Sequence, residues 1–385
     1  MSSQQSGEKC CTTSVMSGSA GLSAEYRKAL EEMEQCVGDI RGHPPEKRNK
    51  PLSPEQEKAI LPAAIERVKA AIHRIPNIGD RRTDYDEAVE KVPHLVEIES
   101  PMDRYLRALN YDAELAAEQI VLFWKKRKQV FGDRALRPMT ITGRGSLTKE
   151  HIYSALCGAF RIMPPDQNQR PVFFIDRAKF LTDAEDPQHR LQIIFYFLYL
   201  LFMESDLALT NGYVILLSME NEANSKLFDF PSPEPSLWSH FVQEPGIPLQ
   251  IKGIHMIFLK KSTFYEKSIP EWLQLYEPYP HLRHRVIAHV VFSRLEILLG
   301  LEAYGLTNAN IPRELNGPVD LDAVGKWHAD RLEIELKRYR YFPMLEQDDD
   351  SADDDTGSSF DDDDDHMDDD WDAEKVGALK DDESS

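Results

Sequence analysis

The chain has 385 residues and a formal net charge of −21 at pH 7. Of its 66 acidic and 45 basic residues, 20 acidic and 2 basic ones lie from Glu346 onward, so this end carries −18 and the rest only −3. Four cysteines without a CxxC pair exclude a zinc ribbon and a disulfide framework. No signal peptide is expected, so a reducing compartment is indicated.

The first part of the chain predicts a disordered segment followed by a small helical module. Residues 1–52 are rich in serine, glycine and polar residues and are expected to be disordered. Ser53 and Pro54 provide an N-cap and a proline at the first helical position. Apolar residues then recur at helical spacing, at Ile60, Ala64, Val68 and Ile72. With further helices expected after Thr83, after Pro101 and over residues 111–130, an all-α module is predicted over residues 53–140.

Helices and strands alternate over residues 141–320, which predicts an α/β domain with a mainly parallel sheet flanked by helices. The expected helices cover residues 147–161, 191–205 and 235–243. The expected strands cover residues 172–175, 212–218 and 249–259. A short helix over residues 264–276 is stopped by Pro278 and Pro280. The pattern over residues 286–299 fits either a helix or a strand.

The most apolar run, residues 191–203, is a candidate for a membrane span or for a buried helix. Thirteen residues fall short of the ~20 that cross a bilayer, so a buried core helix is predicted.

The C-terminal part predicts one helix and then a tail. The helix is expected within residues 321–343, with Val324, Trp327, Leu332 and Leu336 as its apolar residues. Residues 344–385 combine runs of aspartate with few apolar side chains and are expected to be disordered.

Motifs that carry chemistry point away from an enzyme. No Gly-x-Ser-x-Gly elbow occurs. The turn Gly143–Ser146 lacks the spacing of a P-loop, and it reads either as a plain turn before a helix or as an anion-binding turn. Arg283 and Arg285 alternate with His281, His284 and His289, and their charge would repel a metal cation. Neither catalytic residues nor a metal or cofactor is expected.

Several ordered segments resemble the CRAL-TRIO lipid-binding family. Arg170–Phe174 is similar to its Gly-Arg-Pro-Val opening strand, with Gln169 in place of the glycine. Ile251–Ile257 resembles its Gly-Ile-His strand, and Glu277–Tyr279 stands where members often have Lys-Pro-Phe. Ile311–Gly317 resembles its Leu-Pro-x-Glu-x-Gly-Gly end. Arg104–Arg127 is similar to the helical module that precedes the lipid domain.

This resemblance implies non-enzymatic binding, and transfer between membranes, of a phospholipid or another lipid in a cavity closed by a gate helix. The expected partners are therefore a hydrophobic small molecule and, transiently, a membrane surface. No nucleic acid is expected to bind. The protein is expected to be a cytoplasmic monomer that also contacts membranes peripherally. The alternative is a protein-interaction scaffold with a vestigial cavity that acts through its acidic tail.

The ligand-binding residues implied by the resemblance lie on the strands, on the gate helix and just after it. They are Phe173, Ile175, Leu216, His255, Ile257, Phe264, Trp272, Leu275, Tyr276 and Arg285. His255 fits either a histidine of the core or one that lines the cavity. The basic run 125–128 either matches the dipole at a helix C-terminus or binds anionic lipid.

Two positions depart from the family pattern. Relatives that bind phosphatidylinositol carry a glutamate where this chain has Leu249, although the basic partner, Arg285, is present. The central strand ends at Ser218, where members usually have an aspartate. An inositol headgroup site is therefore not implied.

Overall fold

The computed structural model describes residues 52–77, 81–156, 158–176, 179, 187–219, 246–259, 266, 269–270, 273–274, 276, 280–291, 293–315, 317–319 and 324–342. The chain divides into two units, Met1–Leu345 and Glu346–Ser385, and every described residue belongs to the first. The two segments predicted to be disordered and the helix predicted over residues 235–243 lie outside the described residues, except for Leu52.

The helical module begins as the sequence predicts. Ser53 caps α2 (Pro54–Arg74) through a reciprocal pair of bonds with Gln56, in which the Gln56 amide donates to the Ser53 hydroxyl and the Ser53 amide donates to Gln56 Oε1. Of the four predicted apolar positions, Ile60 lies at the surface, and Ala71 takes a place in the core instead.

The described residues of this module form four further α-helices and a short 3-10 helix. They are α3 (Thr83–Lys91), α4 (Pro93–Glu99), α5 (Met102–Ala108), α6 (Ala113–Phe131) and η2 (Gly132–Leu136). Sequence analysis missed α4, which starts with Pro93 at its first position, where a missing amide is harmless. Asp112 caps α6 by accepting a bond from the Leu115 amide.

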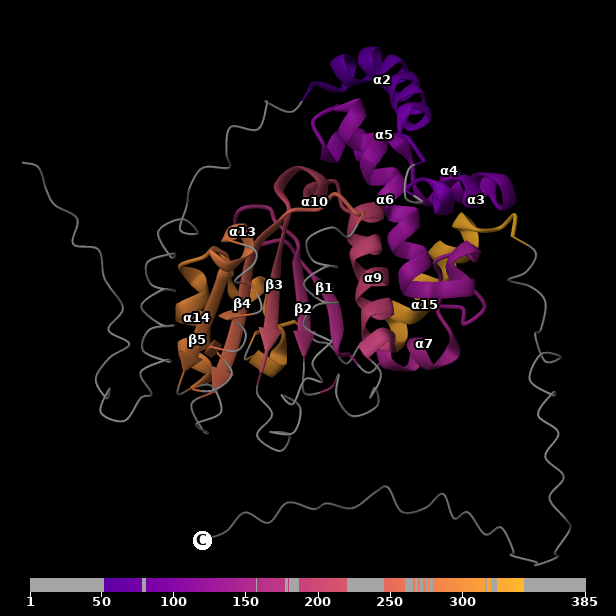
Figure 1. The fold of residues 1–385 in the computed structure, drawn as a ribbon. Coiled ribbons are helices and arrows are strands. Elements are labelled where there is room, and N and C mark those ends of the chain that lie inside the picture. Colours follow the sequence, from indigo (N-terminus) through magenta and orange to yellow (C-terminus); the bar gives the residue numbers. More distant parts are fainter. Residues whose placement is uncertain are drawn as a thin grey trace, which may run out of the picture. The chain divides into compact units, whose positions relative to one another are not determined.

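A five-stranded mixed sheet follows (Figure 1). Its strands lie in sequence order, β1 (Phe160–Met163), β2 (Val172–Asp176), β3 (Tyr213–Ser218), β4 (Ile251–Leu259) and β5 (Val286–Val291). The last four strands are parallel and β1 is antiparallel to β2. The α/β class and the mainly parallel sheet are thus confirmed.

The helix predicted over residues 147–161 is wrong in its second half. The helix α7 spans Lys149–Leu156, and Gly158 then takes a positive φ of 85°, which glycine adopts without strain. The chain turns there into β1, whose four residues pair with β2.

The remaining described helices lie between and after the strands. They are α9 (Pro187–Glu204), α10 (Asp206–Asn211), α13 (Pro280–Arg283), α14 (Arg294–Glu302), α15 (Val324–Arg338) and the short 3-10 turns η4 (Asn308–Asn310) and η5 (Arg313–Leu315). The ambiguous segment 286–299 contains a strand and then the start of a helix, separated by Ser293, whose hydroxyl accepts from the Glu296 amide at 3.4 Å.

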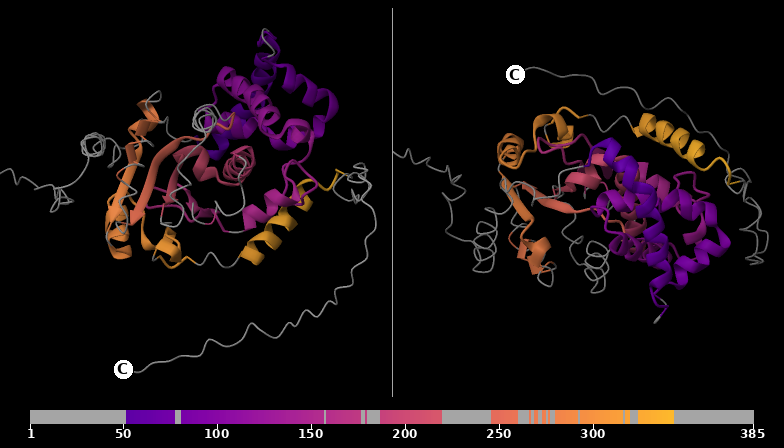
Figure 2. Two further views of the ribbon diagram at one scale, coloured as in Figure 1. Left: turned by 60° about the horizontal axis from the view of Figure 1, so that its bottom comes forward. Right: turned by 90° about the horizontal axis from the view of Figure 1, so that it is seen from above.

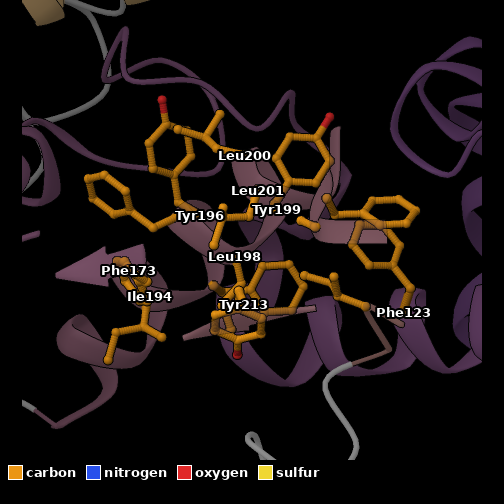
Figure 3. Close-up of a cluster of buried hydrophobic side chains, with 14 of the residues drawn as sticks. Phe123, Phe173, Ile194, Tyr196, Leu198, Tyr199, Leu200, Leu201 and Tyr213 are labelled. Atoms are coloured by element: carbon orange, nitrogen blue, oxygen red, sulfur yellow. The ribbon is translucent and has the colours of Figure 1, made fainter. Parts of the chain in front are cut away.

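The helix α9 is buried almost all round, as the sequence predicts for its apolar run. Figure 3 shows that Phe173 of β2 and Phe123 of α6 approach it from different sides, while the hydroxyls of Tyr196 and Tyr199 point the same way. Among the described residues no helix combines the length and the apolar character that a membrane crossing requires. The helix therefore joins the sheet to the helical module.

The sheet has two buried faces, which we name after the helices packed on them (Figure 2). The α9 face belongs to the core that includes α9 and the helical module. Its residues include Phe173, Ile175, Ile215, Leu217, Ile254, Met256, Phe258, Val286, Ala288 and Val290. The α14 face packs against Ile297 and Leu301 of α14 in a separate core. Its residues include Val172, Phe174, Val214, Leu216, Ile257 and Val291.

Candidate functional site

The strand register divides the predicted ligand-binding residues between the two faces. Phe173 and Ile175 lie on the α9 face, next to Ile215 and Leu217 of β3. Leu216, His255 and Ile257 lie on the α14 face, because successive residues of a strand point to opposite sides. The structure therefore does not bring the predicted set together.

Part of the predicted gate helix lies outside the described residues, including Phe264, Trp272 and Leu275. The described positions 266, 269–270 and 273–274 are helical. Ile269, Leu273 and Tyr276 are 0%, 4% and 1% exposed, and their i, i+4, i+7 spacing places them on one helix face. The sequence prediction included Tyr276 but not Ile269 or Leu273, although the same spacing is visible in the sequence.

This buried helix face belongs to the same core as the α9 face of the sheet. Tyr213 stands at the start of β3. Burial raises its pKa, and the interaction with Tyr276 raises it further. The described residues of the α9 face on β3, β4 and β5 are apolar apart from the hydroxyl of Tyr213. Ala288 and Val290, on the last strand, are half-buried. The result is a surface over three strands whose described side chains are apolar except for the Tyr213 hydroxyl.

The α14 face, on the other side of the sheet, contains a buried pair of histidines. His255 of β4 and His289 of β5 lie 3.0 Å apart from Nδ1 to Nε2, and their rings stack at 5.2 Å. The ring of Tyr304 meets His255 edge-on at 4.9 Å. Burial is the main cause that lowers the pKa of both histidines, to about 4 for His289 and well below the usual value for His255, which also faces His289 and Arg170. Both imidazoles are therefore neutral at pH 7.

Arg285 precedes β5, and its guanidinium donates to the carbonyl of Ile251 at the start of β4. Its own carbonyl accepts from the Ile254 amide at 2.8 Å. Arg285 therefore joins β4 to β5. Leu249, just before β4, is half-buried and packs against the core of the α9 face.

The Gly143–Ser146 turn is held by an arginine. The guanidinium of Arg134 donates to the carbonyls of Gly143, Gly145 and Leu147. The Ser146 amide is also used, because it donates to the Pro138 carbonyl at 2.8 Å. This arrangement favours the plain-turn interpretation over the anion-binding one.

The basic run 125–128 is only partly a surface feature. Lys126 is 7% exposed and Arg127 is fully buried. Lys128 is 35% exposed and lies 3.8 Å from Glu87. Two of the four cations are therefore withdrawn from any membrane contact, which argues against the anionic-lipid interpretation of this run.

A buried polar network fastens α15 to the rest of the molecule, and sequence analysis missed it. Glu335 accepts from Tyr196 Oη at 2.6 Å and from the Ile141 amide at 2.8 Å. Tyr339 donates to Glu99 Oε1 at 2.7 Å, and Glu99 pairs with the fully buried Arg127. We call these five side chains, Glu99, Arg127, Tyr196, Glu335 and Tyr339, the clasp.

The clasp places charge where water is excluded. Burial raises the pKa of Glu335 to about 7 although Tyr196 and Arg331 act in the opposite direction. Burial also lowers the pKa of Arg127 to about 10. The clasp links α15 to α9 and to the helical module, and its groups bond one another and the Ile141 amide, which is typical of a structural network.

The described residues contain no group of three or more potential metal ligands. Comparison of the chain with family models and with curated proteins found no match. The apolar surface of the α9 face over β3 to β5, with the helical segment that contains Tyr276, is the candidate site.

Proposed function

We propose that the α/β domain is of the CRAL-TRIO type and that the protein binds a lipid, without catalysing a reaction, between the α9 face of β3 to β5 and the segment around residues 264–276. The observation that carries this proposal is the largely apolar character of that face and of the helix face Ile269, Leu273 and Tyr276, where the tyrosine hydroxyls are the polar groups. A lipid that leaves an apolar site for water loses about 0.8 kcal/mol per CH₂, so a carrier must enclose its chains.

The positions of the family-like segments support the proposal. Arg170–Phe174 leads into β2 and Ile251–Ile257 lies in β4. The segment 264–276 follows β4 directly, as a gate would. Opening of this segment against a bilayer would release the lipid, and closure would enclose it.

If the lipid lies on the α9 face, the expected lipid contacts change. Phe173 and Ile175 remain candidate contacts, and Met256 and Phe258 of β4 take the role first given to His255 and Ile257. We expect Ala288 and Val290 to line one side, because both are half-buried on the strand next to β4.

The primary experiment is extraction and mass spectrometry of lipid from the full-length protein purified from at least two expression hosts. We expect lipid to co-purify in near-stoichiometric amount. Folded protein without lipid from every host would refute the proposal and favour the interaction scaffold.

A matched pair of variants locates the lipid. Ala288→Trp adds bulk to the α9 face and should lower retained lipid several-fold. Leu299→Trp adds the same side chain to α14 on the other side of the sheet, where Leu299 is 64% exposed, and should retain lipid. Equal retention by two variants with equal thermal stability would place the lipid elsewhere.

The gate and the headgroup are tested by transfer between liposomes. Trp272→Asp puts a charge beside the buried Leu273 and should reduce transfer sharply in folded protein.

With Leu249 in place of an acid, phosphatidylinositol should be a poor ligand, and Leu249→Glu should improve its binding. Robust phosphatidylinositol transfer by the unmodified protein would contradict the second expectation.

A further inference from the structure

Among the described residues, nothing pairs with the backbone groups on the outer edge of β5. Strand β5 is last in the sheet, and among the described residues no strand pairs with its outer side. The Ile254 amide donates to the Arg285 carbonyl, and the register pairs Ile254 with Val286. In a parallel pair this directs the backbone groups of residues 287, 289 and 291 toward β4. Those of Val286, Ala288 and Val290 therefore point outward.

The opposite edge of the sheet is protected, whereas no described strand pairs with the edge at β5. Strand β1 has four residues, and its Arg161 lies under the ring of Trp327 of α15 at 5.3 Å. Strand β5 reads Val-Ile-Ala-His-Val-Val, without proline, lysine or a register shift against β4. Charges, prolines and bulges are the devices that keep sheet edges from pairing with other chains. Their absence marks β5 as an edge that accepts a strand.

We propose that β5 pairs with β5 of a second copy of this chain, antiparallel and centred on Ala288. A two-fold axis at Ala288 sets Val286 opposite Val290 of the copy and Ile287 opposite His289, so β-branched side chains meet across the junction. Two alanines face each other at the axis, where bulky side chains would crowd. Roughly six inter-chain hydrogen bonds would form, because residues 286, 288 and 290 each exchange a pair.

The strand is therefore self-complementary, as an isologous interface requires. An unrelated extended peptide would satisfy the backbone but would not account for the small residue at the centre. A dimer would replace the monomer that the sequence predicts. The two sheets would join into one, with the α9 faces of both copies on the same side.

Ala288→Pro tests the proposal with little harm to the fold. The Ala288 amide points away from β4, so proline there removes an outward donor and leaves the β4 ladder complete. We expect the full-length protein to be a dimer at micromolar concentration by sedimentation velocity. Ala288→Pro should raise the dissociation constant at least ~10-fold and keep the monomer folded. The matched variant Ile287→Pro removes an amide that faces β4 and should lower thermal stability instead.

A second variant and hydrogen exchange of the edge amides test the dimer independently of Ala288→Pro. Val290→Lys places a charge on the edge and should also give a monomer if Ala288→Pro does not fold. In the wild-type dimer the amides of Val286 and Val290 should exchange slowly, and their exchange should become faster on dilution. A wild-type monomer at ~100 µM whose edge amides exchange freely would overturn the proposal. So would protection of these amides in a monomer, which would mean that another segment of the chain covers the edge.

Discussion

Two regions of the molecule bury titratable groups in different ways. The clasp, on the α15 side, encloses Glu335 and the Arg127–Glu99 pair among hydrogen bonds from elements far apart in the chain. The α14 face encloses His255 and His289, which are neutral and bonded to each other. In both regions burial disfavours the charged form, and the carboxyl of Glu335 is neutral at low pH whereas the imidazoles are neutral at high pH. The two regions should therefore respond to pH in opposite directions.

The largest effect is expected from breaking the clasp. Arg127→Met leaves Glu99 as a buried charge without its cation, and loss of one partner of such a pair typically costs 3–5 kcal/mol of unfolding free energy. Lys128→Met, one residue away and 35% exposed, should cost less than about 1 kcal/mol. Urea denaturation measures both changes. Equal effects of the two substitutions would show that the buried pair has no special role.

The histidine pair should cause loss of stability in acid. The folded pKa of His289 is about 4, below its ordinary value of 6.5, so its contribution is complete above pH 6.5 and is lost as the pH falls toward 4. The difference corresponds to about 3 kcal/mol. His289→Gln, which cannot take up a proton, should flatten this loss in urea titrations at pH 4 to 7. An unchanged acid dependence would contradict the burial of a neutral pair.

Glu335 should change the unfolding free energy with pH in the opposite direction to the histidines. Its folded pKa of about 7 lies above its ordinary value of 4.5, so its contribution is complete below pH 4.5 and is lost as the pH rises through 7. Glu335→Gln should remove a loss of about 1–3 kcal/mol. Between pH 4.5 and 6.5 the two regions oppose each other. Wild-type stability should therefore vary less with pH in this window than that of Glu335→Gln, which should rise with pH.

The smallest effect concerns the N-cap of α14. Ser293→Ala removes the acceptor for the Glu296 amide and should cost about 0.5–1 kcal/mol. Because α14 packs on the histidine side of the sheet, hydrogen exchange should accelerate in α14 while α15 keeps its protection. Faster exchange in both helices would mean that the two regions unfold together.

Local patterns predicted the local features of this fold. The Ser53 cap, the buried α9 and three of the parallel strands have signals within a few residues of sequence. The clasp has none, because Glu335 and Ile141 are 194 positions apart and Tyr339 and Glu99 are 240 apart. Strand β1 was missed since its four residues follow a helical pattern without a break other than Gly158.

In the candidate site, the sequence could not assign strand residues to one face of the sheet. All five residues of β2 and all six of β3 are buried, so neither strand alternates between apolar and polar residues. Composition alone could not tell which of Leu216 and Leu217 shares a face with Phe173. Only the register between strands decides this, and register is a tertiary property.

The position of the clasp in the chain has a consequence for biosynthesis. Domains form progressively as the chain leaves the ribosome, N-terminal parts first. The helical module and the sheet would emerge before α15, with Glu99, Tyr196 and the Ile141 amide still lacking their partners Tyr339 and Glu335. The helix α15 would then complete both parts at once. A nascent chain stalled before residue 335 should remain a substrate for chaperones, although its sheet strands have all been made.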